Sequence, residues 1–477
     1  MQAQSRRGQM LSYVRSFLPA TLVLSFGILS VSQPADALPA FARKYGLRCS
    51  ACHEAWPMLN YFGQKFKDNG YQLMNDRDSP IWQNASYWPA TFRIIPFWHR
   101  DSTNKVSVDS VTGDGTSTPI ERQVTSHGFD LSGLDFHTGG TLEKNFSFYV
   151  LPSSDATGSF HFETVMARLD NLAGSPWLNL KLGKFELDNL VSEKRILTLT
   201  SISGVYQTYH FLPQGDANIW GQIGDNQLGL EYMGHSADDR TRVSAALLST
   251  SDGNVSLAAG TNSYTGFLAA SHAFDAGKLG VERVGLYAML GQAPISFLTS
   301  GGAPVLGTGS NKKSFHREGF VGLFYFNKLD FLVVTQHGWD NAWFGQGYGN
   351  ATAPSNGTAG LTGLNCVPGS CVLPATARSP VWNGYMVETH YVHNPQLIFI
   401  QRSEWQRVSQ QPSTTFASNL GNVDMYTFGY RWYPIMNPRA GFALHNEYSW
   451  FRHRGTSPVT FTDLTSSSLL LGFDFDF

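Results

Sequence analysis

The sequence predicts an all-β transmembrane barrel of about sixteen antiparallel strands, preceded by a small helical segment. Three observations predict this fold. Short segments alternate apolar and polar residues over most of the chain, and the connections between them alternate long and short. Charged residues make up 15% of the chain, below the roughly 25% of a typical soluble domain. Aromatic residues reach 13%, and there are 47 glycines.

The final segment, residues 467–477, carries the clearest alternation. Its residues divide between an apolar face and a mixed face: Leu469, Leu471, Phe473, Phe475 and Phe477 against Leu470, Gly472, Asp474 and Asp476. A period of two residues is the signature of a strand. The terminal Phe477 resembles the signal that is read during assembly of outer-membrane barrels.

The same pattern identifies about sixteen strands in all. They fall near residues 90–100, 127–137, 145–152, 159–170, 178–187, 227–234, 240–250, 263–273, 279–291, 314–326, 329–338, 382–392, 396–406, 423–433, 440–453 and 467–477. Bacterial barrels have short periplasmic turns and longer outside loops. An even number of strands leaves both barrel ends in the periplasm, so the preceding segment begins at the periplasmic mouth and could enter the lumen as a plug.

Composition and targeting signals narrow the class further. The net charge is −2, which offers no basic field for nucleic acid. Arg6, Arg7 and Arg15 precede an apolar run at residues 17–31, and Ala35-Asp36-Ala37 is typical of a signal-peptidase site. The expected domains are therefore a signal peptide at 1–37, a small segment at 38–87 and the barrel at 88–477. The expected location is a bacterial outer membrane, with its lipid as a partner.

Residues 49–53 read Cys-Ser-Ala-Cys-His, the attachment sequence for a c-type haem. Two thiols one helical turn apart can reach both vinyl groups of a porphyrin, and the adjacent His can ligate the iron. We therefore expect one covalent haem c on Cys49 and Cys52, with His53 as the proximal ligand. Zinc would need two further ligands, and a thioredoxin-like dithiol would need a βαβ unit.

The second axial position of the iron stays undecided between three residues and an open or water-bound iron. Met74 follows a turn at Gly70 and can fold back, so it is the preferred candidate. Met58 lies five residues after His53, which makes the opposite face of the haem hard to reach. His99 lies in the first expected strand and could ligate from the barrel wall.

The remaining cysteines, Cys366 and Cys371, fall in the longest expected outside loop. A disulfide bond between them would pin that loop in an oxidising compartment.

Alternation also assigns six His and Glu residues to inward faces, where they either attract a divalent cation or simply keep the lumen polar. They are His161, Glu163, Glu388, His390, His445 and Glu447.

The order of these features resembles the outer-membrane monohaem cytochrome–porin fusions. The resemblance rests on a Pro-Ala-Phe-Ala-Arg start at residues 39–43, one C-x-x-C-H motif, and Asn-x-Phe-Gly-x-x-Phe-Lys-x-x-Gly-Tyr at residues 60–71, followed by a porin-like barrel. The known members are the Fe(II)-oxidising cytochromes of iron-oxidising bacteria. The resemblance implies a haem inside or under the barrel, and oxidation of extracellular Fe(II) with transfer of electrons to a periplasmic cytochrome or another acceptor.

Two other functions fit the same sequence. The chain could deliver electrons outward, or it could be a solute porin whose haem segment serves for docking or sensing. A reduction potential would separate inward from outward transfer, and solute flux would reveal a porin. Neither quantity follows from sequence, because a haem potential depends on ligation, hydrogen bonding and exposure.

Replacing both Cys49 and Cys52 by Ala should abolish covalent haem, because no other cysteine pair has an adjacent His. Haem staining of the protein after denaturing electrophoresis measures this directly. The matched control replaces Cys366 and Cys371 by Ala and should keep full staining. Covalent haem that persists without Cys49 and Cys52 would refute the assignment.

Overall fold

The computed structural model describes residues 39–55, 58–73, 78, 80–83, 89–111, 117–154, 157–188, 207–211, 223–250, 263–294, 312–341, 379–409, 422–437, 440–457 and 459–476. The expected signal peptide at 1–37 and the terminal Phe477 lie outside these residues. Among the described residues, no helix has both the length and the apolar character needed to cross a bilayer.

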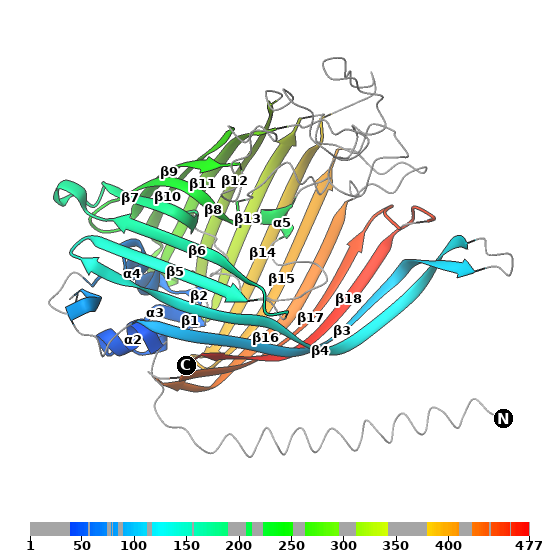
Figure 1. Cartoon of the computed structure of the whole chain (residues 1–477), viewed down its shortest axis with the longest axis horizontal. Helices are drawn as coiled ribbons and strands as arrows, with labels where there is room; N and C mark the ends of the chain where they lie inside the picture. Colours follow the sequence, from blue (N-terminus) through cyan, green and yellow to red (C-terminus); the bar gives the residue numbers. More distant parts are fainter. Residues whose placement is uncertain are drawn as a thin grey trace.

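Sixteen of the described strands form one closed antiparallel barrel, which confirms the predicted fold. Each strand pairs with its neighbours in sequence, and the last strand closes the ring on the first. Figure 1 shows the strands side by side and tilted. They are β3 (Ala90–Val111), β4 (Ser117–Glu143), β5 (Phe146–Ser154), β6 (Phe160–Leu169), β7 (Asn179–Glu186), β8 (Asn226–His235), β9 (Thr241–Ser249), β10 (Tyr264–Asp275), β11 (Val281–Pro294), β12 (Lys312–Phe326), β13 (Leu329–Asp340), β14 (Val381–Asn394), β15 (Leu397–Val408), β16 (Val423–Asn437), β17 (Ala440–His453) and β18 (Leu464–Asp476).

The outer surface of the barrel is apolar. Leu247, Leu268, Leu286 and Leu290 point outward with 55–65% of their surface exposed. Outward aromatic pairs lie towards both ends of the strands: Tyr426–Trp450 near one rim, and Phe442–Phe473 near the other. An apolar band between aromatic girdles is the surface of a barrel embedded in lipid, and it places the chain in a bacterial outer membrane.

The connections differ at the two ends of the barrel, as predicted. At one rim β12 and β13 are joined by two residues, and Asn145 and Asn327 take the left-handed conformation that tight turns require (φ 64° and 58°). At the other rim, β13 and β14 are separated by residues 341–380. The short-turn rim corresponds to the periplasmic side of bacterial barrels.

The first hairpin differs from the prediction. Residues 101–126 were expected to form a long loop, but β3 and β4 continue through most of this range and project beyond the other strands (Figure 1). Contacts with the β17–β18 connection hold the projection. Glu121 accepts hydrogen bonds from the backbone N–H groups of Val459 and Thr460, both at 2.8 Å. These partners lie more than 300 residues away, so no local pattern revealed them.

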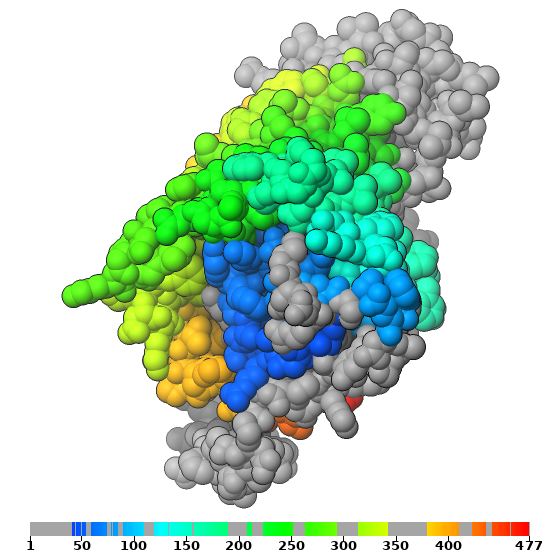
Figure 2. Space-filling view, turned by 90° about the vertical axis from the view of Figure 1, so that its left-hand side faces the viewer, coloured from blue at the N-terminus to red at the C-terminus, as the bar shows by residue number. Residues whose placement is uncertain are grey.

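The N-terminal segment lies inside the barrel at the short-turn rim, as a plug. It comprises α2 (Pro39–Tyr45), α3 (Cys49–Cys52), β1 (His53–Ala55), β2 (Met58–Leu59), α4 (Tyr61–Asp68) and the 3₁₀ turn η1 (Ile81–Gln83). Figure 2 shows these residues, in blue, filling the mouth of the ring of strands. Tyr45, Phe66 and Tyr71 of the segment share one buried cluster with inward residues of the wall such as Tyr149 and Met386.

A short helix that does not belong to the plug also packs against the inner wall. Helix α5 (Gln207–His210) contacts β13, β14 and β15. The backbone N–H of Thr208 donates to Glu404 at 2.8 Å, and its hydroxyl accepts from Gln406 at 2.8 Å. The interior of this barrel therefore holds more than one segment of chain.

Replacing Leu286 by Arg should destabilise the barrel by about 2–4 kcal/mol, because Leu286 faces lipid near the middle of β11. The matched control is Leu279→Arg in η5 (Gly277–Leu279), at the short-turn rim, which should cost about 0–1 kcal/mol. Urea titration of the protein in lipid vesicles gives both free energies of unfolding. Equal costs at the two positions would contradict the inferred depth of Leu286.

Candidate functional site

The two cysteines of the C-x-x-C-H motif are the first and last residues of α3, a single helical turn. Residues three apart are neighbours on a helix surface. The Cys52 side chain is half-buried and forms no disulfide bond. Burial raises the pKa of the Cys52 thiol to about 11, so this thiol is neutral at neutral pH.

His53 follows α3 directly and starts the β1–β2 hairpin. Its side chain is only 9% exposed, and its backbone pairs with Leu59 of β2. The motif is therefore a helical turn that leads into a small hairpin, and His53 is largely shielded from solvent.

The second sequence motif, residues 60–71, builds the core of the plug around aromatic rings. Phe66 packs edge-on against Phe41 (5.2 Å between ring centroids) and Tyr45 (5.4 Å). Tyr71 stacks on Phe41 at 5.0 Å, and also on Tyr149 of the barrel wall at 5.8 Å. The aromatic positions of the motif thus join the plug both to itself and to strand β5.

Gly70 is required where the plug meets the β6–β7 turn. Its φ of +71° is a left-handed conformation that favours glycine. A Cβ at this position would lie 2.0 Å from Oδ2 of Asp170. Only a residue without a side chain lets the plug approach the wall this closely.

Buried arginines of the wall hold the C-terminal end of α4. Arg168 of β6 donates to the carbonyl oxygens of Lys67 (2.6 Å) and Asp68 (2.5 Å), and pairs with Asp170 at 2.6 Å. Cations are favourable at a helix C-terminus, where carbonyl groups lack partners. Arg168 therefore stabilises the helix and docks it at the same time.

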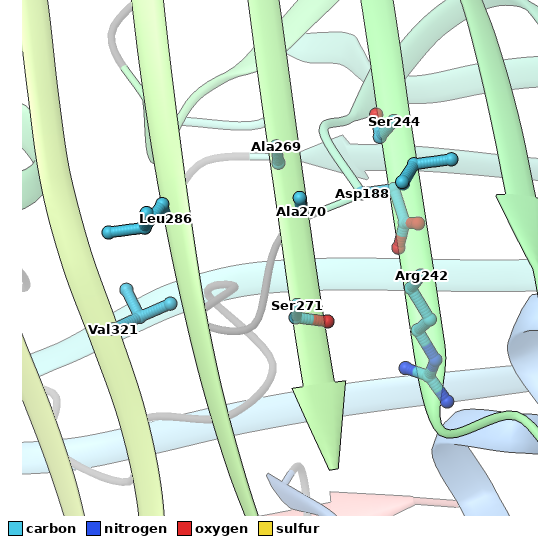
Figure 3. A pocket seen from close by; sticks show the side chains of 9 residues that line it. Asp188, Arg242, Ser244, Ala269, Ala270, Ser271, Leu286 and Val321 are labelled. Carbon is cyan, nitrogen blue, oxygen red and sulfur yellow. The ribbon is translucent and has the colours of Figure 1, made fainter.

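Two further ion pairs complete the docking. Arg242 of β9 binds Asp68 of the plug at 2.6 Å and also pairs with Asp239. Lys67 of the plug binds Glu186 of β7 at 2.8 Å. A cavity of about 20 Å³ lies beside Arg242, lined by small side chains of β10 such as Ala269 and Ser271 (Figure 3). The plug is seated on the wall by charged groups that water scarcely reaches.

Polar anchors also tie the plug to the short turns. The Trp82 indole N–H donates to the carbonyl of Leu142 at 2.9 Å, at the end of β4. The Tyr61 hydroxyl donates to the carbonyl of Asp238 at 3.2 Å, in the β8–β9 turn. These contacts keep the C-x-x-C-H segment at the periplasmic mouth.

The chemistry of the donor set fits a c-type haem. Two cysteines one helical turn apart and an adjacent buried His are the residues that thioether attachment and axial ligation require. Within the described part of the chain, no three His, Cys, Asp or Glu side chains come together as a metal site. The zinc alternative therefore finds no additional ligands among these residues.

The candidates for the second axial ligand have different outcomes. Met74 lies outside the described residues, as do Cys366 and Cys371. Met58 belongs to β2, but its side chain is also outside them. His99 lies on β3, facing inward, with Nδ1 2.6 Å from Asp101 and Nε2 3.8 Å from Asp130. The choice between the three stays a prediction.

Four of the six predicted inward residues lie in buried charged networks. His390 contacts Asp330 (2.9 Å) and Glu388 (2.7 Å), beside the Arg402–Glu404 pair. A similar group joins side chains of the three strands β16, β17 and β18, namely Arg431, His445, Glu447 and Asp474. These side chains pair with one another, which agrees with the simpler interpretation, a polar inner wall of mutually paired charges.

The other two residues lie on β6. His161 pairs in register with the inward Ser153, and Glu163 is the extra residue at a bulge between Phe162 and Thr164. Sequence alternation cannot reveal such a bulge, because one extra residue reverses the faces that follow it.

Comparisons with known proteins found likenesses of architecture. The chain is similar to an anion-selective porin from Comamonas acidovorans (11% identity, TM-score 0.48, covering 81% of this chain and 98% of that one). It is also similar to OprB of Pseudomonas putida (10%, 0.47, 81% and 94%) and to a loop-deletion mutant of OmpT, an outer membrane protein of Vibrio cholerae (10%, 0.44, 81% and 99%). No protein-family model and no curated protein matches the sequence.

Replacing Arg242 by Gln should release the plug, because it removes the guanidinium group that bridges the buried carboxylates of Asp68 and Asp239. Removing one partner of a buried pair costs about 3–5 kcal/mol. Protease cleavage within residues 39–73 should become faster, and single-channel conductance in planar bilayers should rise. The matched control is Arg240→Gln, an exposed arginine two residues away that pairs with Asp238; unchanged cleavage in both variants would show that Arg242 does not dock the plug.

Proposed function

We propose that this chain is an outer-membrane electron conduit, in which one haem c on Cys49, Cys52 and His53 would exchange single electrons between extracellular Fe(II) and a periplasmic carrier. The activity would be that of an Fe(II) oxidase, with the carrier as electron acceptor. The observation that carries the proposal is the position of the C-x-x-C-H segment, which is docked inside the periplasmic mouth of a closed barrel.

The docking supports electron transfer over solute transport. An Fe(II) donor needs a path only from the outer rim to the site at the periplasmic mouth, whereas a solute needs a continuous aqueous path through the whole barrel. Arg168 and Arg242 hold α4 in the mouth through buried charged contacts, so the described plug is a built-in part of the lumen. The wall thus insulates the site from lipid while the plug stays accessible from the periplasmic side (Figure 2).

Two inward carboxylates near His99 support a cationic substrate. Asp101 and Asp130 face inward beside His99, and Asp130 keeps 47% of its side chain exposed. Accessible carboxylates raise the local concentration of cations in a cleft. They would attract Fe(II) electrostatically without forming a fixed coordination site.

The stoichiometry agrees with a single redox centre. Each Fe(II) gives up one electron and becomes Fe(III), and a haem held by Cys49, Cys52 and His53 would supply a one-electron acceptor. The chain's own part is to keep the donor and the acceptor on opposite sides of the bilayer, and to hold His53 buried. Two-electron organic chemistry is not expected of this site.

A second candidate function, a solute porin with a haem module, is favoured by one feature. A groove of about 440 Å³ runs between α4 and the wall, lined by residues that include Tyr61, Phe62, Arg283 and Leu323. Such space beside the plug could let small solutes pass. Flux of sugars and ions through reconstituted protein separates the two functions, because an electron conduit should leak little.

Fe(II) mixed rapidly with the oxidised protein should reduce its haem, at a rate proportional to the Fe(II) concentration. Stopped-flow absorbance at the haem bands follows the reaction. Zn(II) has the same charge but no redox activity, and it should leave the bands unchanged. If the haem stays ferric although its measured potential permits reduction, direct iron oxidation is wrong, and outward transfer or solute transport takes its place.

A further inference from the structure

Helix α3 is too short to be stable on its own. It has four residues, from Cys49 to Cys52, and the last four carbonyl groups of any helix lack partners within that helix. A single turn fixes several backbone torsions for very few hydrogen bonds, so its nucleation is unfavourable. The turn that carries both cysteines must be held by another part of the chain.

Asn60 supplies the missing contacts to three of the four residues of α3. Its backbone N–H donates to the carbonyl of Cys52 at 2.9 Å. Its side-chain Nδ2 donates to the carbonyls of Ser50 at 3.2 Å and Ala51 at 3.1 Å. One residue thus ties three consecutive carbonyl groups of the C-x-x-C turn.

The same side chain also begins the next helix. Asn60 is the N-cap of α4, and its Oδ1 accepts a hydrogen bond from the backbone N–H of Gly63 at 2.9 Å. Ser, Thr and Asp would cap a helix about as well. Among these residues only Asn has an NH₂ group that can donate at the same time. The need to cap α4 and to bind the carbonyls of α3 with one side chain therefore explains why Asn occupies this position.

Gly63 lets the two helices come together. A Cβ on Gly63 would lie 2.0 Å from the carbonyl oxygen of Cys52 and 2.8 Å from its carbonyl carbon. No side chain fits at that distance, so only glycine permits this approach. Asn60 and Gly63 both belong to the motif at residues 60–71, and both contact α3.

The contacts also close the loop that carries His53. His53 leaves α3 after Cys52 and pairs with Leu59, the residue just before Asn60. The Asn60–Cys52 hydrogen bond therefore closes the base of the hairpin, and it fixes the direction in which the chain leaves the cysteine turn.

We infer that Asn60 and Gly63 are positioning residues for the haem-attachment turn: they clamp α3 against α4 and thereby set the orientation of His53. This inference rests on the proposed function, since it assumes that the turn holds a haem. The clamp acts on the folded protein, so the covalent bonds to Cys49 and Cys52 should form without it.

The test compares three variants of the full-length, haem-loaded protein in detergent or lipid. Asn60→Ser keeps an N-cap oxygen but loses both Nδ2 donors, and Asn60→Ala loses the cap as well. Asn69→Ser changes the C-cap residue of the same helix and is the matched control. Midpoint reduction potential and the low-spin EPR signals of the ferric protein report the orientation of the axial His.

Asn60→Ser and Asn60→Ala should both shift the midpoint potential and split or broaden the EPR signals, while haem staining per chain stays at the wild-type level. Amide hydrogen exchange in the first turn of α4 should speed up chiefly in Asn60→Ala, because only that variant lacks a cap. Asn69→Ser should match the wild type. Gly63→Ala, which must push the helices apart, should shift the same two signals and serves as the second test if an Asn60 variant assembles poorly.

Wild-type potential and EPR signals in Asn60→Ser and Gly63→Ala would overturn the inference and leave the proposed function standing. Absence of covalent haem from the wild-type protein would instead refute the proposed function. Haem staining of the wild type separates these two failures, and the stopped-flow reaction with Fe(II) tests the electron-transfer part of the proposed function independently of the Asn60 and Gly63 variants.

Discussion

Closure of the barrel by pairing β18 with β3 is the constraint on which the rest of the structure depends. No water is present in the hydrocarbon core to satisfy free backbone groups, so a sheet that crosses the bilayer must have no open edge there. The register from Asp476↔Arg93 to Ser466↔Thr103 meets this condition with residues more than 360 positions apart. Closure also creates two surfaces of opposite character, an outward one for lipid and an inward one that must be filled or solvated.

The inward surface is organised by paired charges. Arginines on β6, β9, β15 and β16 each contact at least one carboxylate, and two of them, Arg168 and Arg242, reach the plug. A buried charge without a partner is costly, so these pairs restrict the arrangements that the interior can adopt. The same pairs restrict how the plug can dock, because Asp68 and the C-terminus of α4 must lie where Arg242 and Arg168 of the wall can bind them.

Within the plug, the segments that contain the C-x-x-C-H motif are individually too small to fold. Helix α3 and the β1–β2 hairpin gain stability from α4 through Asn60 and Gly63, and α4 gains it from the wall through Phe66, Arg168 and Arg242. The barrel wall therefore stabilises α4, and α4 in turn stabilises the turn that carries the two cysteines. This dependence explains how a segment of about fifty residues, small for an independent core, can hold a defined geometry next to a membrane.

The sequence by itself determined the strands, their number and the two kinds of connection, because a wall with lipid on one side and a polar interior on the other imposes a period of two residues on every strand. It also pointed to Cys49, Cys52 and His53, because covalent haem attachment needs those residue types at that spacing. Only the tertiary structure decided the extension of β3 and β4, the bulge at Glu163, the partners of His390 and His445, and the roles of Asn60, Arg168 and Arg242. Each of these depends on contacts between residues that are distant along the chain or on a local break in register. A periodic pattern cannot encode them, since it records which face a residue takes and not what lies opposite.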